Sequence, residues 1–243
     1  MAQTLPAVLS IALSSVLVGY LVLLLPLTGR KRYRLLEQRL ADDATQREVA
    51  YRHGMARQWA LAVLALLLLA LAGVSPAQAG VTLHVHGLRP LVPGLVGLLI
   101  GGVVVALLLR GSPARAGRLL QPVAALLPRT RRERRFFVGV ALTAGVAEEV
   151  LYRGFLLDYL VHRPGALALT PALVLAGLAF GVAHAYQGLL GMVMTGLAGY
   201  ALAALYVTTG SLLLPVVVHA LVDLRILLVV TRGAASEPLA AAG

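Results

Sequence analysis

The sequence contains no cysteine among its 243 residues. Disulfide bonds, thiol catalysis and cysteine-ligated metal sites are therefore excluded. Charged residues are also scarce, because they make up 13% of the chain, whereas soluble proteins carry roughly 25%. The G-x-S-x-G motif of serine hydrolases does not occur either. What remains is a hydrophobic chain in which each of the few charges is informative.

Hydrophobic residues make up 59% of the chain, and the mean hydropathy is +0.87. Apolar runs of about 20 residues recur along the whole length, and such a run is long enough to cross a bilayer as a helix. The fold class expected is therefore all-α, a polytopic transmembrane helical bundle. We expect about seven spans, at residues 6–28, 59–76, 91–109, 136–161, 167–186, 188–208 and 211–231.

The net charge of +11 comes mainly from two connectors, residues 30–58 and 110–135, which contain eight Lys or Arg each. Seven spans place both connectors on one side, which the positive-inside rule makes cytoplasmic. The N-terminus is then outside and the C-terminus cytoplasmic, in what we expect to be a bacterial plasma membrane. These arginines set topology and contact anionic lipid headgroups, so no nucleic-acid partner is expected. The 30–58 connector is expected to be helical and to lie along the membrane surface.

The chain divides into four expected segments. Residues 1–110 hold the N-terminal membrane helices with their basic connector, and 111–135 form a basic amphipathic cytoplasmic segment. Residues 136–231 form a catalytic helical core, and 232–243 are a disordered tail.

Ionisable residues within the expected spans are the best functional candidates. A charge at mid-bilayer costs about 2.5–3.5 kcal/mol on insertion scales, so it is rare and usually functional. Here these residues are confined to the fourth, fifth and seventh spans. They are Glu148, Glu149, Arg153, Asp158, His184, His219, Asp223 and Arg225.

Helical spacing divides these residues by role. Glu149 and Arg153 are four residues apart, so they share a helix face and are expected to form an ion pair. Glu148 is turned from Glu149 by about 100° and is expected to face a cavity instead. His219 and Asp223 are also four apart and are expected to point into that same cavity.

Two kinds of chemistry suit Glu148, His184, His219 and Asp223. A glutamate and a histidine around one water form a general-base pair, and the activated water can attack a peptide carbonyl. The second histidine and the aspartate would then stabilise the oxyanion or hold the water. The same four side chains are also a suitable nitrogen and oxygen set for zinc or another divalent ion, which would activate the water directly. The sequence therefore leaves open whether the site binds a divalent metal.

Three motifs in order resemble one known family. EEVLYR at 148–153 resembles an EExxxR motif, FGVAH at 180–184 resembles FxxxH, and HALVD at 219–223 resembles HxxxN or HxxxD. Together they are similar to the CPBP family, which comprises type II CAAX prenyl endopeptidases and bacteriocin-processing or immunity proteins, and is also called Abi. The resemblance covers about residues 136–230 and implies a glutamate-dependent intramembrane protease or a metalloprotease.

The resemblance also implies a role for each matching residue. Glu148 would be the base that activates water, and His184 would assist it. His219 and Asp223 would form the oxyanion site.

Arg153 would fix the first motif through Glu149, and Phe180 would support the second motif. Prenyl proteases of the family usually carry Asn at the position of Asp223. An ionised Asp cannot donate a hydrogen bond to an oxyanion. Asp223 is therefore protonated, orients His219, or ligates a metal.

The function predicted is hydrolysis of a peptide bond in a membrane-associated substrate, either prenylated or bacteriocin-like. The expected partners are a peptide or membrane-protein substrate and the lipid bilayer. One alternative is a non-catalytic immunity or scaffold protein with the same fold. A second is a transporter, which ranks lower because transporters often show internal repeats and none is evident here.

Overall fold

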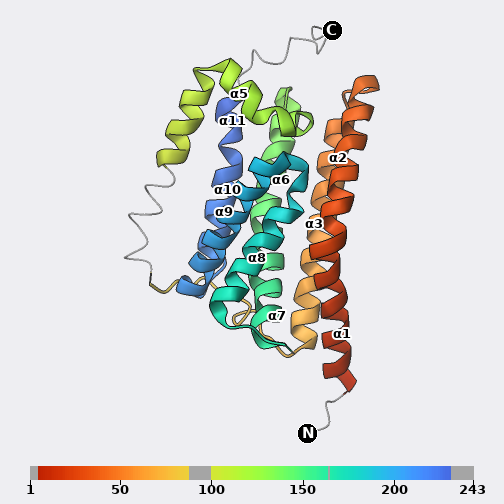
Figure 1. The fold of residues 1–243 in the computed structure, drawn as a ribbon, viewed down its shortest axis with the longest axis vertical. Coiled ribbons are helices and arrows are strands. Elements are labelled where there is room, and N and C mark those ends of the chain that lie inside the picture. Colours follow the sequence, from red (N-terminus) through yellow and green to blue (C-terminus); the bar gives the residue numbers. More distant parts are fainter. Residues whose placement is uncertain (1–4, 88–99, 164, 231–243) are drawn as a thin grey trace.

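The computed structural model describes residues 5–87, 100–163 and 165–230, and every regular element in these ranges is a helix (Figure 1). The predicted all-α class is confirmed. The elements are α1 (Leu5–Gly19), η1 (Tyr20–Leu24), α2 (Leu25–Asp42), α3 (Gln46–Leu71), the helix Ile100–Arg110, α5 (Pro113–Leu120), η2 (Gln121–Leu126), α6 (Arg131–Glu149), η3 (Val150–Leu156), α7 (Leu157–His162), α8 (Leu169–Ala183), η4 (Ala185–Gln187), α9 (Gly188–Thr209), α10 (Leu213–Leu224) and α11 (Ile226–Val229).

Three helices are long and apolar enough to cross a membrane, namely Val8–Asp42, Gln46–Leu71 and Ala185–Thr209. Large apolar side chains on their outer faces are exposed, for example Leu67 at 62% and Leu189 at 77%. Such apolar exteriors identify an integral membrane protein. By length and composition, three of the described helices qualify as membrane spans, which is fewer than the seven expected. Parts of the expected third span and the whole 232–243 tail lie outside the described residues.

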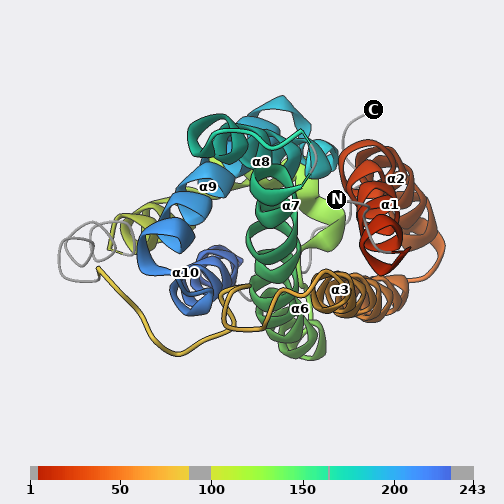
Figure 2. The same cartoon turned by 90° about the horizontal axis from the view of Figure 1, so that it is seen from below.

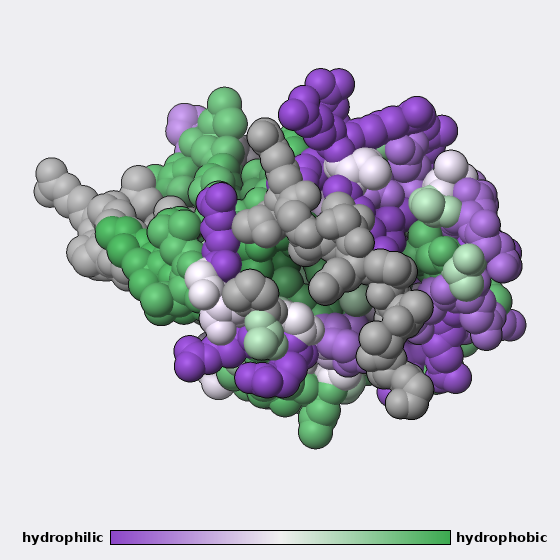
Figure 3. Space-filling view, turned by 90° about the horizontal axis from the view of Figure 1, so that it is seen from above, coloured by the Kyte–Doolittle hydropathy of each residue, from purple (hydrophilic) through white to green (hydrophobic). Residues whose placement is uncertain are grey.

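The basic connector 30–58 does not lie along the membrane surface, so that prediction was wrong. α1, η1 and α2 form one continuous helix that ends at Asp42, and α3 begins at Gln46. Arg, Leu, Gln and Glu are good helix formers, so the polar sequence extends the two membrane helices instead of starting a new one. In Figure 1, α2 and α3 rise side by side, and Figure 3 shows hydrophilic residues gathered on their side of the upper end. We call this end of the bundle, with α5 and the first turn of α6, the basic end.

A buried ion pair joins the elements of the basic end. Arg47 of α3 contacts Glu133 of α6 at 2.8 Å, and its Nε donates to the Ala125 carbonyl of η2, also at 2.8 Å. The two side chains are only 4% and 5% exposed. Glu133 and Thr130 also form a capping box that starts α6. The segment before α6 is therefore tied to α3.

A single helix built from α6, η3 and α7 runs through the middle of the bundle. Figure 2 shows it between α1, α2 and α3 on one side and α9 and α10 on the other. All seven residues of its π-helical part, Val150–Leu156, are buried. The EEVLYR motif crosses from α into π geometry, and π segments inside helices occur frequently at functional sites. The sequence pattern did not predict this segment.

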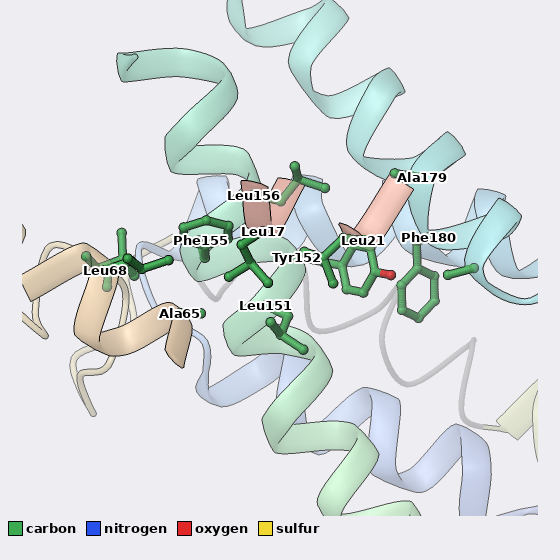
Figure 4. Close-up of a cluster of buried hydrophobic side chains, with 13 residues drawn as sticks. Leu17, Leu21, Ala65, Leu68, Leu151, Tyr152, Phe155, Leu156, Ala179 and Phe180 are labelled. Atoms are coloured by element: carbon green, nitrogen blue, oxygen red, sulfur yellow. The ribbon is translucent and has the colours of Figure 1, made fainter. Parts of the chain in front are cut away.

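The π segment packs into an apolar cluster that α1, η1, α3 and α8 complete (Figure 4). Leu17 and Leu21 contribute from the first helix, and Tyr152 and Phe155 from η3. Phe180 closes the cluster next to Tyr152, with ring centroids 5.0 Å apart. This packing fixes the rotation of the central helix, and with it the directions of the two glutamates.

Glycines allow α8 and α9 to approach closely. A Cβ added to Gly181 would lie 2.5 Å from the Met192 carbonyl oxygen, and one added to Gly177 would lie 3.0 Å from that of Gly196. Small residues at such contacts let helix backbones come together in membranes. The contact holds the C-terminal end of α8, with Phe180 and His184, against the centre of the bundle.

Candidate active site

The four residues predicted for the site lie together. Glu148 lies in the last turn of α6, His184 follows α8, and His219 and Asp223 lie one turn apart on α10. Oε2 of Glu148 is 3.9 Å from Nε2 of His184 and 3.9 Å from Nε2 of His219. Oδ2 of Asp223 is 3.7 Å from the same His219 nitrogen. The predicted convergence of three helices on Glu148 is thus present in the structure.

The two oxygens of Glu148 have different environments. Oε1 accepts a hydrogen bond of 2.6 Å from Nε2 of Gln58, on α3. Oε2 is buried and has no hydrogen-bond partner among the described residues. One oxygen is therefore held while the other faces the histidines. Gln58 was not predicted, because a neutral residue near a span end gives no signal in a search for intramembrane charges.

His184 is held by the helix that it terminates. Its Nδ1 lies 2.8 Å from the carbonyl oxygen of Phe180. A carbonyl can only accept, so Nδ1 donates its hydrogen to it, and Nε2 lies on the side of Glu148. The F-x-x-x-H spacing places this carbonyl one turn before the histidine.

Glu149 contacts two cationic or basic groups with one oxygen. Its Oε1 lies 2.9 Å from Nη1 of Arg153 and 2.7 Å from Nδ1 of His219. The predicted Glu149–Arg153 pair is confirmed. The contact with His219 was not predicted, since the orienting role was considered for Asp223. The structure instead gives His219 its close partner from the central helix.

Phe180 packs against several members of the site. Its ring centroid is 4.6 Å from that of His184, 5.8 Å from that of His219 and 4.7 Å from the guanidinium carbon of Arg153. Arg153 also donates to the Gly199 carbonyl of α9 at 2.9 Å. A Cβ on Gly199 would lie 3.0 Å from Phe180. Phe180 therefore spaces the two histidines and covers the buried arginine.

The site is open on the side of Asp223. The side chain of Asp223 is 37% exposed, against 15% for Glu148, 14% for His184 and 8% for His219. His184 leads directly into η4, which packs against α2 and η2 at the basic end. Access from that end would place the opening on the side with the basic connectors.

The four side chains are not arranged as a metal centre. Within residues 5–87, 100–163 and 165–230, no group of three or more His, Asp or Glu side chains has metal-binding geometry. Zinc at 2.0–2.1 Å from tetrahedral ligands would set them about 3.4 Å apart, whereas the separations here are 3.7–3.9 Å. Separations beyond direct hydrogen-bond distance leave a position for a water that contacts both groups.

Comparison with known proteins agrees with the motifs. Residues 132–225 match the family model of type II CAAX prenyl endopeptidase Rce1-like proteins. No match was found among curated proteins or among solved structures. The matched segment contains α6 to α10 with all four candidate catalytic residues, so it covers the helices that build the site. The predicted resemblance is thus confirmed: residues 132–225 of this integral membrane protein are similar to type II CAAX prenyl endopeptidase Rce1-like proteins.

Proposed function

We propose that the protein is an intramembrane endopeptidase in which Glu148 activates a water molecule. One observation carries this proposal: the unpartnered Oε2 of Glu148 lies 3.9 Å from Nε2 of His184 and of His219. A water between Glu148 and His184 can donate one hydrogen to each, which leaves an oxygen lone pair for attack. The match to a CAAX protease family supports peptide hydrolysis as the reaction.

In the proposed reaction, Glu148 takes a proton from the water as the oxygen attacks the substrate carbonyl. The Nδ1–H group of His184 donates to the Phe180 carbonyl, which fixes the ring. Nε2 of His184 then accepts a hydrogen bond from the second hydrogen of the water and so fixes the orientation of the water. Glu148 then passes its proton to the leaving amine. Because the same carboxylate takes the proton and later gives it away, Glu148 returns to its starting state. The products are two shorter peptides.

His219 is the proposed oxyanion donor. Glu149 stabilises the charged imidazolium through Nδ1, and Nε2–H can then donate to the carbonyl oxygen as negative charge develops. Asp223, with its carboxylate 3.7 Å from Nε2, adds to the stabilisation of the imidazolium. In this scheme Asp223 acts through His219 and does not itself donate to the oxyanion.

The substrate is proposed to be a membrane-associated peptide or protein, prenylated or bacteriocin-like, that reaches the site from the basic end. The positive-inside rule makes this end cytoplasmic. A bacterial plasma membrane is the proposed location.

The test uses purified protein in liposomes with two peptide pools, one S-farnesylated and one unmodified, and mass spectrometry of the products. Wild-type protein is compared with Glu148→Gln, and Asp42→Asn is the control because Asp42 is exposed at the end of α2. Products are expected from wild type and Asp42→Asn and not from Glu148→Gln. Identical products from Glu148→Gln, or no products from either pool, would overturn the proposal and favour a non-catalytic role.

A further inference from the structure

Two cavities lie against α2 at the basic end, and Arg34 lines both of them. One has a volume of about 340 Å³, which is within the range of small-ligand sites. We call it the η4 cavity, because it lies between α2, η2 and the η4 turn that follows His184. Its lining residues include Arg30, Tyr33 and Arg34 of α2, with Ala185, Tyr186 and Gly188 from η4 and the start of α9.

The walls of the η4 cavity are held together by direct contacts. The rings of Tyr33 and Tyr186 stack with their centroids 5.8 Å apart. The Tyr33 hydroxyl accepts a hydrogen bond of 3.3 Å from the backbone N–H of Ala125 in η2. Tyr186 also packs near His184, with ring centroids 5.9 Å apart. The cavity is therefore preformed, and one of its walls continues directly into the candidate active site.

Two guanidinium groups give the η4 cavity its positive charge. Arg30 and Arg34 are exposed and four residues apart, so they share one face of α2. Among the residues that the structure describes, no carboxylate oxygen lies within 4.0 Å of either group. Basic residues on the neighbouring helices do have such a partner, since Arg52 and Arg132 contact Glu48 at 3.8 and 3.0 Å. An anion in the cavity would meet two cations that the described part of the chain leaves unpaired.

The second cavity connects this positive surface to the lipid-facing part of the helix. It has a volume of about 350 Å³ and is lined by Leu27, Lys31, Arg34, Leu35 and Gln38. Leu23 and Leu27, one turn apart, are 64% and 68% exposed on the candidate span Val8–Asp42. Exposed leucines on a span face acyl chains. The basic side chains of α2 thus begin where its lipid-facing leucines end.

We propose that Arg30 and Arg34 bind the phosphate of an anionic phospholipid in the η4 cavity. The acyl chains of this lipid lie along the exposed leucines of α2, and its phosphate lies between the two arginines. Guanidinium groups donate paired hydrogen bonds to phosphate, and basic pockets between membrane helices suit anionic headgroups. Tyr33 and Tyr186 add aromatic rings of the kind found at the headgroup level. The bound lipid holds the η4 turn, and with it His184.

The experiment measures lipid binding to the purified full chain in detergent. The protein is mixed with equal amounts of phosphatidylglycerol and phosphatidylcholine, and native mass spectrometry counts the bound molecules of each lipid. Wild type is compared with the double variant Arg30→Gln, Arg34→Gln and with Arg30→Lys, Arg34→Lys. The matched control is Arg115→Gln, Arg118→Gln, which removes two exposed arginines from α5 at the same end of the bundle.

Wild type and the α5 control are expected to bind phosphatidylglycerol in preference to phosphatidylcholine. The glutamine variant of α2 should bind phosphatidylglycerol about tenfold more weakly, equivalent to about 1.4 kcal/mol. The lysine variant should keep part of the affinity, because lysine retains the charge but not the paired donors. No preference in wild type, or equal losses in the α2 and α5 variants, would overturn the inference.

Backbone hydrogen exchange tests the link to the η4 turn. In wild type, the amides of residues 185–188 should exchange more slowly with phosphatidylglycerol than with phosphatidylcholine, and the glutamine variant of α2 should show no such difference. Equal exchange in wild type with the two lipids would overturn the link between the lipid and His184.

A soluble occupant gives a different result. If glycerol phosphate, or a peptide with a free carboxylate, displaces phosphatidylglycerol at comparable concentrations, the acyl chains add nothing and the inference is wrong. Neither the binding nor the exchange measurement requires cleavage. Failure of the proposed peptidase function would therefore leave this inference standing, and the two can be told apart.

Discussion

Glu149 Oε1 lies 2.7 Å from Nδ1 of His219, so a residue of the central helix holds the imidazole of α10. The same oxygen accepts from Arg153 at 2.9 Å. The two adjacent glutamates therefore act on different parts of one site. Oε2 of each glutamate has no hydrogen-bond partner among the described residues, and that of Glu148 lies 3.9 Å from the Nε2 atoms of both His184 and His219.

Replacing Glu149 should cost more stability than replacing Glu148. Glu149→Ala leaves a buried Arg153 without its anion, and breaking such a pair costs about 3–5 kcal/mol. Glu148→Gln keeps the shape of the side chain, so thermal unfolding in detergent should show a large loss only for Glu149→Ala. Equal unfolding temperatures for the two variants would contradict the structural role of Glu149.

Removing the amide that holds Glu148 should reduce turnover. In Gln58→Ala the carboxylate loses its 2.6 Å hydrogen bond and can rotate away from the histidines. Misplacement of a catalytic group costs up to about 100-fold, so kcat should fall while KM changes little. A larger effect on KM than on kcat would show that Gln58 binds substrate and does not position Glu148.

A methyl group on Gly181 should disrupt the contact between α8 and α9. Its Cβ would lie 2.5 Å from the Met192 carbonyl oxygen, which is backbone and cannot move away easily. Overpacking of this kind costs about 1–3 kcal/mol, and both unfolding temperature and cleavage should fall. Gly54→Ala is the matched control on α3, since nothing lies within 4 Å of its added Cβ. Equal effects at both positions would exclude the close contact as the cause.

The Arg47–Glu133 pair should give the fold an acid-sensitive contribution. Glu133 precedes the apolar part of α6. Burial would raise its pKa, but hydrogen bonds from the Thr130 and Arg129 backbone and from Arg47 outweigh burial and hold the pKa below the usual range. The ionised form therefore stabilises the fold above the unfolded value of about 4.3, and this contribution is lost as the pH falls through the lowered folded pKa.

The measurement compares thermal unfolding of wild type and Glu133→Gln from neutral pH down to about pH 3. Wild type should be more stable at neutral pH, and the difference should shrink in acid. A difference that is independent of pH would contradict the role assigned to the charge of Glu133.

Chelation should leave cleavage intact. The separations of 3.7–3.9 Å among Glu148, His184, His219 and Asp223 are longer than the about 3.4 Å between tetrahedral zinc ligands, and the proposed reaction uses no metal. Activity in liposomes is therefore expected to survive dialysis against a chelator, with metal content followed by elemental analysis. Loss of activity that added zinc restores would show that Glu148, His184, His219 and Asp223 hold a metal after all.

The site was predictable where it depended on residues of one helix. A spacing of four correctly paired Glu149 with Arg153, and the rotation of one residue correctly separated Glu148 from them. Partners from other helices were less accessible to sequence reasoning. Gln58 carries no charge, and the contact of His219 with Glu149 depends on how α10 packs against α6.

The fold was predictable in class but not in two details. The polar 30–58 connector was interpreted as a surface segment, yet its good helix formers extend α2 and α3 beyond the apolar region. Hydrophobic periodicity also cannot reveal the π segment Val150–Leu156, because all of its residues are buried and no polar face marks its period.

That π segment makes the central helix sensitive to chain length. A π turn is equivalent to one extra residue accommodated within an α-helix. Deleting a single residue from Val150–Leu156 would leave an uninterrupted and regular helix. The turn would hold one residue fewer, so the buried side chains of Val150–Leu156 could not all keep their present neighbours. The segment should therefore tolerate insertions and deletions far less well than substitutions of one apolar residue by another.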